Sequence, residues 1–209
     1  MKTIGRIQCI TAPRRDCDMA EQAARLCGAG CNWLQFRMKS GKRQEKLELG
    51  RRVADICRSW GAVFIVNDDI ELAAQLGADG VHLGLQDESP RVARRILGNH
   101  AIIGGTCNTM EDIRQRHRQE VDYIGLGPYR FTSTKKQLSP LLGLRGIEEI
   151  LRCCRLEKIA IPTVAIGGIR REDVATLRKA GVHGIAVSSL LIDAAEPADL
   201  LNEIMEKLE

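Results

Sequence analysis

"FIVNDDIELAAQLGADGVHLGLQD", residues 64–87, contains two apolar runs that both end near carboxylates. The first run, FIV, is followed by Asp68 and Asp69, and the second, VHLGL, is followed by Asp87. A helical pattern and a glycine-centred break separate the runs, as in a strand–helix–strand unit. The strands of such a unit run parallel, so their carboxyl ends meet at one edge of the sheet. If the two runs are neighbouring strands, their acidic side chains lie on the same rim.

The same unit returns along the whole chain. Eight short apolar runs lack polar–apolar alternation, which is typical of strands buried on both faces of a parallel sheet. They are residues 4–10, 32–36, 63–67, 80–84, 101–106, 123–127, 162–168 and 184–189. Amphipathic segments that predict helices lie between them, including 43–59, 89–97, 110–118, 145–156, 171–179 and 197–208. Eight such units close naturally into a barrel, so the sequence predicts an α/β fold, a single (βα)8 TIM-barrel domain over residues 1–209.

The alternative fold is an open doubly wound sheet. That fold predicts a Gly-x-Gly-x-x-Gly turn after the first strand, and the sequence CITAPRRD at residues 9–16 contains no such turn. The barrel is therefore the favoured fold.

The composition is that of an ordinary globular protein, with 44% hydrophobic and 28% charged residues. No apolar stretch reaches the roughly 18 residues of a membrane span, and the first residues lack the apolar core of a signal peptide. We therefore expect a cytoplasmic protein without a membrane partner. The net charge is only +4, and the basic runs at 94–100 and 114–119 contain no aromatic residues. These runs indicate solvated helix faces and no nucleic-acid partner.

The chain has eight cysteines, too few for a disulfide scaffold in a protein of this size. Those inside periodic segments are expected to be reduced, buried core residues, namely Cys9, Cys57, Cys153 and Cys154. Cys27 and Cys31 are four residues apart, but no second pair of Cys or His completes a zinc site.

The predicted rim offers a metal site between Asp68 and Asp87. Two facing carboxylates repel each other unless a cation lies between them, and Mg²⁺ takes oxygen ligands while keeping water and substrate phosphate in its shell. Asp68 has an alternative role as the N-cap of the next helix, because Glu71 stands three residues later as in a capping box. Asp87 lacks this alternative, because Ser89 can cap the following helix and Pro90 suits its first position. We therefore expect Mg²⁺ as the cofactor.

Cationic side chains follow the second strand. Gln35, Arg37 and Lys39 alternate with Phe36 and Met38, and side chains two residues apart point the same way on a strand. If that face is the barrel mouth, Arg37 and Lys39 meet an anion there, and the fork of an arginine suits two phosphate oxygens. The alternative, a chain that simply leaves the strand for solvent, suits Lys39 but not Arg37.

Two further regions indicate phosphate binding. Gly167 and Gly168 follow the seventh strand and Ser188 follows the eighth, where this fold commonly binds a phosphate. The longest loop follows the sixth strand, and we predict that its residues 129–139 form a lid. Its phosphate-seeking side chains are Thr132, Ser133, Thr134 and Lys135. Two groups of residues suited to phosphate binding, together with a metal site, imply two phosphorylated substrates or one large one.

Taken in order, these segments resemble the thiamine phosphate synthase family, also called thiamine-phosphate pyrophosphorylase. The resemblance spans nearly the whole chain and rests on residues 35–39, 67–69, 80–84, 86–87, 127–135, 165–169 and 187–188. It implies a transferase that joins hydroxymethylpyrimidine diphosphate to thiazole phosphate, in its carboxylated or decarboxylated form, and releases pyrophosphate. It also implies a dissociative mechanism, with Mg²⁺ on Asp68 and Asp87 steadying the leaving group.

The resemblance further assigns the small-molecule contacts. The pyrimidine diphosphate would contact Gln35, Phe36, Arg37, Met38, Lys39, Asn67, Thr106 and Lys135. The thiazole phosphate would contact Thr132, Ser133, Thr134, Gly168, Val187 and Ser188. Arg37, Thr106 and Lys135 would be the catalytic residues.

The chain departs from the family pattern at two places. The family usually has His two residues after the Ser or Thr that follows the fifth strand, where this chain has Asn108. The family usually has Phe-Pro before the lid threonines, where this chain has Arg130-Phe131. Because of these two departures, the sequence does not determine how the lid closes. It also does not determine the oligomeric state, including whether the chain forms a homo-oligomer.

Two rival functions stay open at this point. One is the related thiazole tautomerase, which isomerises the thiazole phosphate and needs no diphosphate site. The other is a non-catalytic barrel that senses thiamine intermediates. The joint presence of Gln35, Arg37, Lys39, Asn67 and the two aspartates argues against the tautomerase.

Overall fold

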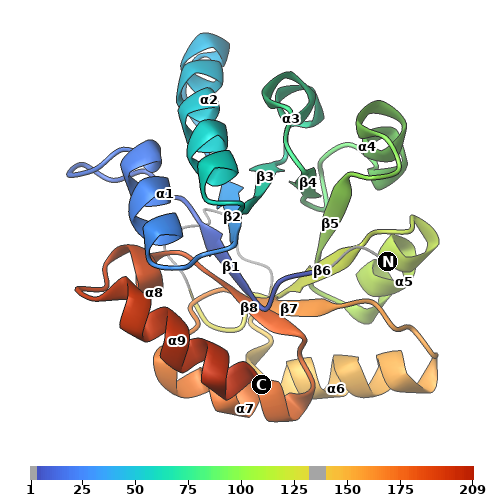
Figure 1. The fold of residues 1–209 in the computed structure, drawn as a ribbon. Helices are drawn as coiled ribbons and strands as arrows, with labels where there is room; N and C mark the ends of the chain where they lie inside the picture. Colours follow the sequence, from blue (N-terminus) through green and yellow to red (C-terminus); the bar gives the residue numbers. More distant parts are fainter. Residues whose placement is uncertain (1–3, 132–139) are drawn as a thin grey trace.

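The computed structural model describes residues 4–131 and 140–209, which contain a closed barrel of eight parallel strands (Figure 1). The strands are β1 (Ile7–Ile10), β2 (Trp33–Phe36), β3 (Val63–Asn67), β4 (Gly80–Leu83), β5 (Ile102–Cys107), β6 (Tyr123–Leu126), β7 (Thr163–Ile166) and β8 (Gly184–Val187). Each strand pairs with the next, and β1 pairs with β8 to close the barrel. The predicted fold is therefore confirmed.

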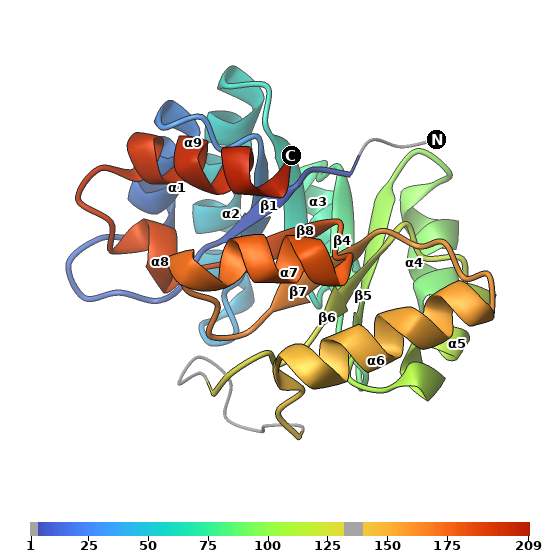
Figure 2. The same cartoon turned by 90° about the horizontal axis from the view of Figure 1, so that it is seen from below.

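Helices form a ring outside the barrel, and Figure 2 shows α6, α7 and α9 along one side of it. The helices are α1 (Met19–Gly28), α2 (Arg43–Ser59), α3 (Ile70–Leu76), α4 (Pro90–Leu97), α5 (Met110–Arg118), α6 (Gly143–Leu156), α7 (Val174–Ala180), α8 (Ser189–Ile192) and α9 (Pro197–Leu208), with a 3-10 turn, η1 (Arg171–Asp173), before α7. The bounds predicted for α2, α5 and α9 are confirmed. No helix in the described part of the chain is long and apolar enough to cross a membrane.

The two apolar runs of residues 64–87 are neighbouring strands. β3 and β4 pair in parallel, with Asn67 opposite His82. The chain therefore leaves both strands at the same rim of the barrel, as the sequence predicted, and Asp68 and Asp87 follow from there.

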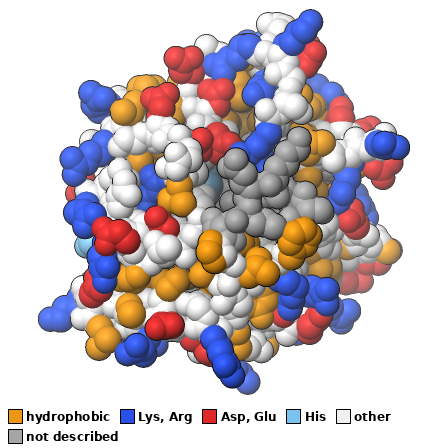
Figure 3. Space-filling view, turned by 180° about the vertical axis from the view of Figure 1, so that it is seen from behind, with side chains coloured by type: hydrophobic (Ala, Val, Ile, Leu, Met, Phe, Trp, Pro, Cys, Tyr) orange, Lys and Arg blue, Asp and Glu red, His pale blue; other side chains and the backbone are white. Residues whose placement is uncertain are grey.

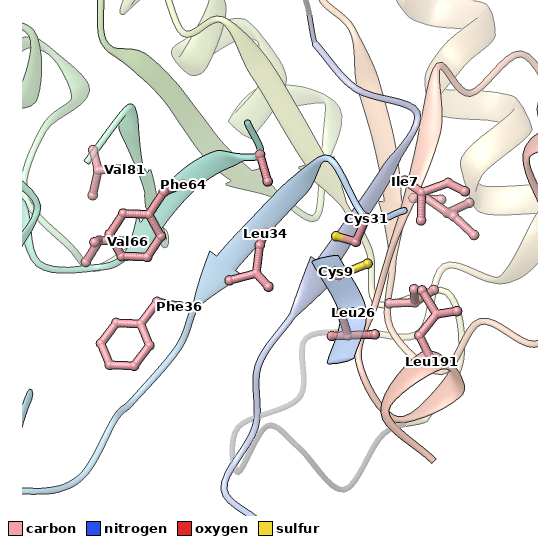
Figure 4. Close-up of a cluster of buried hydrophobic side chains, with 14 of the residues drawn as sticks. Ile7, Cys9, Leu26, Cys31, Leu34, Phe36, Phe64, Val66, Val81 and Leu191 are labelled. Atoms are coloured by element: carbon pink, nitrogen blue, oxygen red, sulfur yellow. The ribbon is translucent and has the colours of Figure 1, made fainter. Parts of the chain in front are cut away.

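Apolar side chains divide between two cores. One core lies between the strands and the helices, and Figure 4 shows part of it around Leu34 and Phe36. The other fills the barrel interior, where Trp33 packs edge-on against Tyr123 with ring centroids 4.9 Å apart. Neighbours along a strand point to opposite sides, so Trp33 and Leu34 belong to different cores. This alternation decides which side chains after each strand can reach the barrel mouth.

All eight cysteines are free thiols. Cys9, Cys57 and Cys154 are buried as predicted, whereas Cys153 is partly exposed. In Figure 4 the sulfur atoms of Cys9 and Cys31 lie close together in the outer core.

The basic run at 114–119 is only partly a solvated helix face. On α5, Arg118 is exposed and Arg114 is partly exposed, and both pair with Glu111. Arg116 is only 5% exposed and donates to main-chain carbonyls at and just beyond the ends of β4 and β5. For Arg116 the prediction was wrong, because sequence patterns treat an arginine as a surface residue and do not show carbonyls that a distant strand supplies.

Candidate active site

A cavity of about 730 Å³ opens where the chain leaves β2, β3 and β4. Its lining includes six residues predicted for the site, namely Phe36, Met38, Lys39, Asn67, Asp68 and Asp87. It also includes polar and charged residues that the sequence did not assign to the site, namely Arg43, Lys46, Asp69, Glu71, Gln86 and Glu88. Figure 3 shows the face behind the barrel of Figure 1, where acidic and basic side chains lie next to one another.

The two predicted metal ligands lie together in this cavity. Their carboxyl groups are within hydrogen-bonding reach of each other. The Asp68 carboxylate also accepts the Lys39 ammonium at 2.9 Å, and the Asp87 carboxylate accepts the Gly84 N–H at 2.6 Å. A cation or a shared proton is needed to hold two carboxyl groups this close, because two carboxylate charges repel.

The surroundings separate the two acids electrostatically. Burial alone would raise the pKa of Asp68, but its hydrogen bonds with Asp87 and Lys39 bring that pKa below its ordinary value. Burial and the neighbouring Asp68 raise the pKa of Asp87, and the Gly84 N–H opposes this. The hydrogen bonds from Asp87 and Lys39 thus favour the charged form of Asp68, whereas Asp87 is the acid that is protonated more readily.

Asp69, and not Asp68, caps α3. The Asp69 carboxylate accepts the Leu72 N–H at 2.7 Å and pairs with Arg43 at 2.6 Å. Asp68 instead has a φ of 66°, in the left-handed region that a non-glycine residue adopts at a cost of about 1–3 kcal/mol. The alternative role of Asp68 as an N-cap was therefore wrong, because this backbone turn leaves its neighbour to cap α3 while Asp68 pairs with Lys39 and Asp87.

At the end of β2, Gln35 and Phe36 point to opposite sides of the barrel wall. The Gln35 side chain lies in the barrel interior and donates to Gln8 at 3.0 Å. Burial lowers the pKa of Arg37 and the charge of Asp68 opposes this, which places the guanidinium near the acids. Phe36 and Met38 pack in the core between the strands and the helices. Their side chains therefore border the cavity from the helix side. On the barrel side, these two residues can contact a substrate only through their main-chain atoms.

A chain of buried polar side chains crosses the barrel interior. It runs from Gln35 through Gln8, whose amide donates to the Tyr123 hydroxyl at 3.0 Å. His82 then contacts Tyr123 at 3.0 Å with Nδ1 and Thr106 at 3.0 Å with Nε2. Gln35 and Thr106, both predicted to bind substrate, are thus held by one network. The sequence did not assign Gln8, His82 or Tyr123 to the site, although a polar residue inside an apolar run was a signal for the first two.

The residues predicted to contact a phosphate lie at the ends of β7 and β8. Gly167 and Gly168 have φ values of 99° and 61°, which glycine adopts without strain. The hydroxyl oxygen of Ser188 is buried and has no hydrogen-bond partner among the described residues. A buried hydroxyl without a partner costs about 1–3 kcal/mol, so a ligand that bonds to it would be favoured. Val187 is buried, and its side chain belongs to the outer core.

The predicted lid lies mostly outside the described residues. Thr132, Ser133, Thr134 and Lys135 belong to the undescribed segment 132–139.

The base of the predicted lid is held by the residues that depart from the family pattern. Arg130 forms two bonds to Asp173, at 2.7 and 2.9 Å, and a third to the Gly168 carbonyl at 2.7 Å. The Asn108 amide donates to the Gly127 carbonyl. Both departures therefore fix main-chain carbonyls on either side of the β6–β7 rim.

The Arg130–Asp173 pair predicts a pH effect on stability. The hydrogen bonds from Arg130 hold the pKa of Asp173 below its ordinary value. A carboxylate with a lowered pKa in the folded state stabilises the fold above its unfolded pKa of about 3.9, and loses this effect as the pH falls. Asp173→Asn should therefore be less stable than the wild type near pH 7, and the difference should shrink as the pH falls from about 5 to 2. Urea unfolding across this range measures it, and a constant difference would contradict the assignment.

The comparisons with known proteins agree with this geometry. A family model described as thiamine monophosphate synthase matches residues 7–191. A thiamine-phosphate synthase from Flavobacterium johnsoniae is 44% identical over 191 residues, which cover 91% of this chain and 90% of the relative. A thiamine-phosphate synthase from Bacteroides fragilis is 41% identical over 199 residues, which cover 95% of this chain and 98% of the relative.

A solved structure has the same fold over nearly its whole length. It is a thiamine phosphate pyrophosphorylase from Pyrococcus furiosus, with a TM-score of 0.83 and 29% sequence identity, covering 98% of this chain and 97% of that one. The match of the family model to most of the chain, the two curated relatives and this structure agree with one another. The chain belongs to the thiamine monophosphate synthase family.

Proposed function

We propose that the chain joins hydroxymethylpyrimidine diphosphate to thiazole phosphate, giving thiamine phosphate and pyrophosphate with the assistance of Mg²⁺. Membership of the family makes the chain a transferase of thiamine biosynthesis. The proposed substrates and the role of Mg²⁺ rest on one observation: Lys39, Asp68 and Asp87 line the same cavity, and Arg37 lies near Asp68. One site therefore contains cationic side chains that can bind a diphosphate and carboxylates that can bind the Mg²⁺ ion that accompanies it.

The oxygen donors at Asp68 and Asp87 fit Mg²⁺. Within residues 4–131 and 140–209, no group of three or more His, Cys, Asp or Glu side chains could hold a metal ion. Mg²⁺ is commonly held by one or two carboxylates, with water and substrate phosphate completing its shell. Asp68 and Asp87 would supply the carboxylates, and bound Mg²⁺ would neutralise charge on the departing diphosphate.

The first half of the reaction separates the diphosphate from the pyrimidine. Arg37 and Lys39 would bind the diphosphate oxygens, while Gln35 and Thr106 would orient the pyrimidine from the two ends of the buried polar chain. The C–O bond breaks, and its electron pair leaves with pyrophosphate. Charge stabilisation and positioning carry such a step better than an acid or a base.

The second half forms the new C–N bond. The thiazole nitrogen would donate its lone pair to the pyrimidine cation left by the first half. Gly168, Val187 and Ser188 would hold the thiazole phosphate, and the buried Ser188 hydroxyl supports this assignment. From the resemblance, Thr132, Ser133 and Thr134 would complete the contacts.

Product formation with both substrates tests the proposal. The protein is mixed with Mg²⁺ and the two substrates, with the thiazole phosphate in carboxylated or decarboxylated form, and pyrophosphate and thiamine phosphate are measured. Equal amounts of the two products are expected, and only when both substrates are present. Isomerisation of the thiazole phosphate alone would identify a tautomerase, and binding without turnover would identify a sensor. Either result would refute the proposed condensation.

A substitution in the predicted lid should change the fate of the pyrimidine. Lys135→Ala is expected to lower turnover about tenfold, the effect of losing one charge-assisted hydrogen bond. If the lid excludes water from a cationic intermediate, the variant should also release pyrimidine alcohol by hydrolysis. Chromatography of the products measures the ratio of alcohol to thiamine phosphate. An unchanged ratio together with unchanged turnover would remove Lys135 from the mechanism.

A further inference from the structure

Arg116 lies inside the protein although it belongs to the basic run on α5. Its guanidinium donates to the Gly84 carbonyl at 2.7 Å, and more weakly to Leu83 at 3.4 Å and Thr106 at 3.5 Å. A buried cation is costly unless hydrogen bonds compensate for its lost water. The cation is thus held by main-chain carbonyls, and it holds those carbonyls in return.

The shortest of these bonds acts on the turn that presents Asp87. The N–H of Gly84 donates to the Asp87 carboxylate at 2.6 Å, while the carbonyl of Gly84 accepts from Arg116 at 2.7 Å. The Leu83 carbonyl, which shares a peptide group with the Gly84 N–H, faces the same guanidinium. A donor at that carbonyl polarises the peptide and strengthens its N–H as a donor. Arg116 therefore acts on Asp87 through a single peptide group.

The Arg116 side chain also packs closely against β5. A Cβ atom at Gly105 would lie 2.8 Å from the Arg116 Cδ and 2.9 Å from its Nε, closer than real Cβ contacts. The missing side chain at position 105 thus makes the space that Arg116 occupies. Across that space the Arg116 Nε reaches the carbonyl of Thr106 at 3.5 Å.

We propose that Arg116 is a positioning residue for the metal and pyrimidine diphosphate half of the site, acting through the ends of β4 and β5 that present Asp87 and Thr106. The inference rests on the proposed function, because it takes Asp87 as a metal ligand and Thr106 as a pyrimidine contact. It does not involve the thiazole phosphate, whose predicted contacts belong to β7, β8 and the loop after β6.

Binding of Mn²⁺ to the protein without substrates gives a test independent of turnover. Arg116→Met keeps an unbranched apolar stem but removes the donors and the charge. Loss of a positive charge near the site would by itself strengthen cation binding. Loss of positioning should weaken it, by about tenfold if one charge-assisted hydrogen bond is lost. A titration followed by electron paramagnetic resonance of free Mn²⁺ shows whether the variant binds Mn²⁺ more tightly or more weakly than the wild type.

Steady-state kinetics supplies a second readout. Arg116→Met should raise the KM for the pyrimidine diphosphate about tenfold and leave the KM for the thiazole phosphate unchanged. Arg118→Met removes the same charge from an exposed position on the same helix and should behave like the wild type. A purely structural role for Arg116 would lower the melting temperature and the active fraction without separating the two KM values.

Gly105→Ala keeps the proposal testable if Arg116→Met does not fold. The added methyl group would displace the Arg116 side chain without removing its charge, and should weaken Mn²⁺ binding and raise the same KM. Unchanged or tighter Mn²⁺ binding in the folded variants, or equal changes in both KM values, would overturn the inference alone. A wild-type protein that neither binds Mn²⁺ nor forms thiamine phosphate would overturn the proposed function, and the inference with it.

Discussion

Asp87→Asn is expected to lower kcat/KM by at least about 100-fold, the usual cost of removing one group that stabilises developing charge in a site. The asparagine keeps the shape of the side chain and an oxygen to accept the Gly84 N–H, but it loses the charge that would hold Mg²⁺. Folding should be retained, because Ser89 caps α4 and Pro90 begins it, so Asp87 has no role in that helix start. The removal of one of two adjacent acids also relieves repulsion with Asp68.

Activity at increasing Mg²⁺ concentration, together with thermal unfolding, measures this prediction. EDTA should abolish turnover of the wild type. Asp55→Asn is a suitable control, because it removes an exposed carboxylate on α2 that pairs with the exposed Arg58. Wild-type rates in Asp87→Asn, or full turnover of the wild type in EDTA, would exclude a metal role for Asp87.

Asp68 can be tested in parallel, because it does not cap α3. Asp68→Asn is the better substitution, since asparagine tolerates the left-handed backbone of this position while alanine does not. It should reproduce the loss of activity in Asp87→Asn. Asp69→Asn keeps a good N-cap residue and should be far less harmful.

Arg37→Lys is expected to lower kcat/KM by about 10- to 100-fold although the positive charge is kept. A lysine cannot reproduce the planar fork that binds two oxygens of a diphosphate at once. The partly buried position of Arg37 near Asp68 also favours a fixed guanidinium over a flexible ammonium. The KM for the pyrimidine diphosphate and kcat should both change, because the fork acts on substrate and leaving group alike.

Arg58→Lys offers a matched control for this substitution. It makes the same replacement at an exposed ion pair with Asp55 near the end of α2, and should leave the kinetics unchanged. If Arg37→Lys also had wild-type kinetics with a normal melting temperature, Arg37 would have only a structural role.

The order of the elements was determined by the sequence alone. Apolar runs without polar alternation, several of them preceded by a glycine break, predicted eight parallel strands, and local amphipathic periodicity gave the bounds of α2, α5 and α9. The rim position of Asp68 and Asp87 followed as well, because consecutive units in a barrel place the ends of their strands together. These features are local, or follow from the rule that joins neighbouring units.

The contacts of the candidate site were decided only by the tertiary structure. The sequence could not choose between Asp68 and Asp69 as the cap of α3, because both precede the helix and the choice depends on the backbone turn after β3. It also missed the path from Gln35 to Thr106, whose members come from five different strands. The burial of Arg116 was missed for the same reason. The buried polar path and the bond from Arg116 to Gly84 join residues that are distant in the chain, and only closure of the barrel brings their polar atoms within hydrogen-bonding distance.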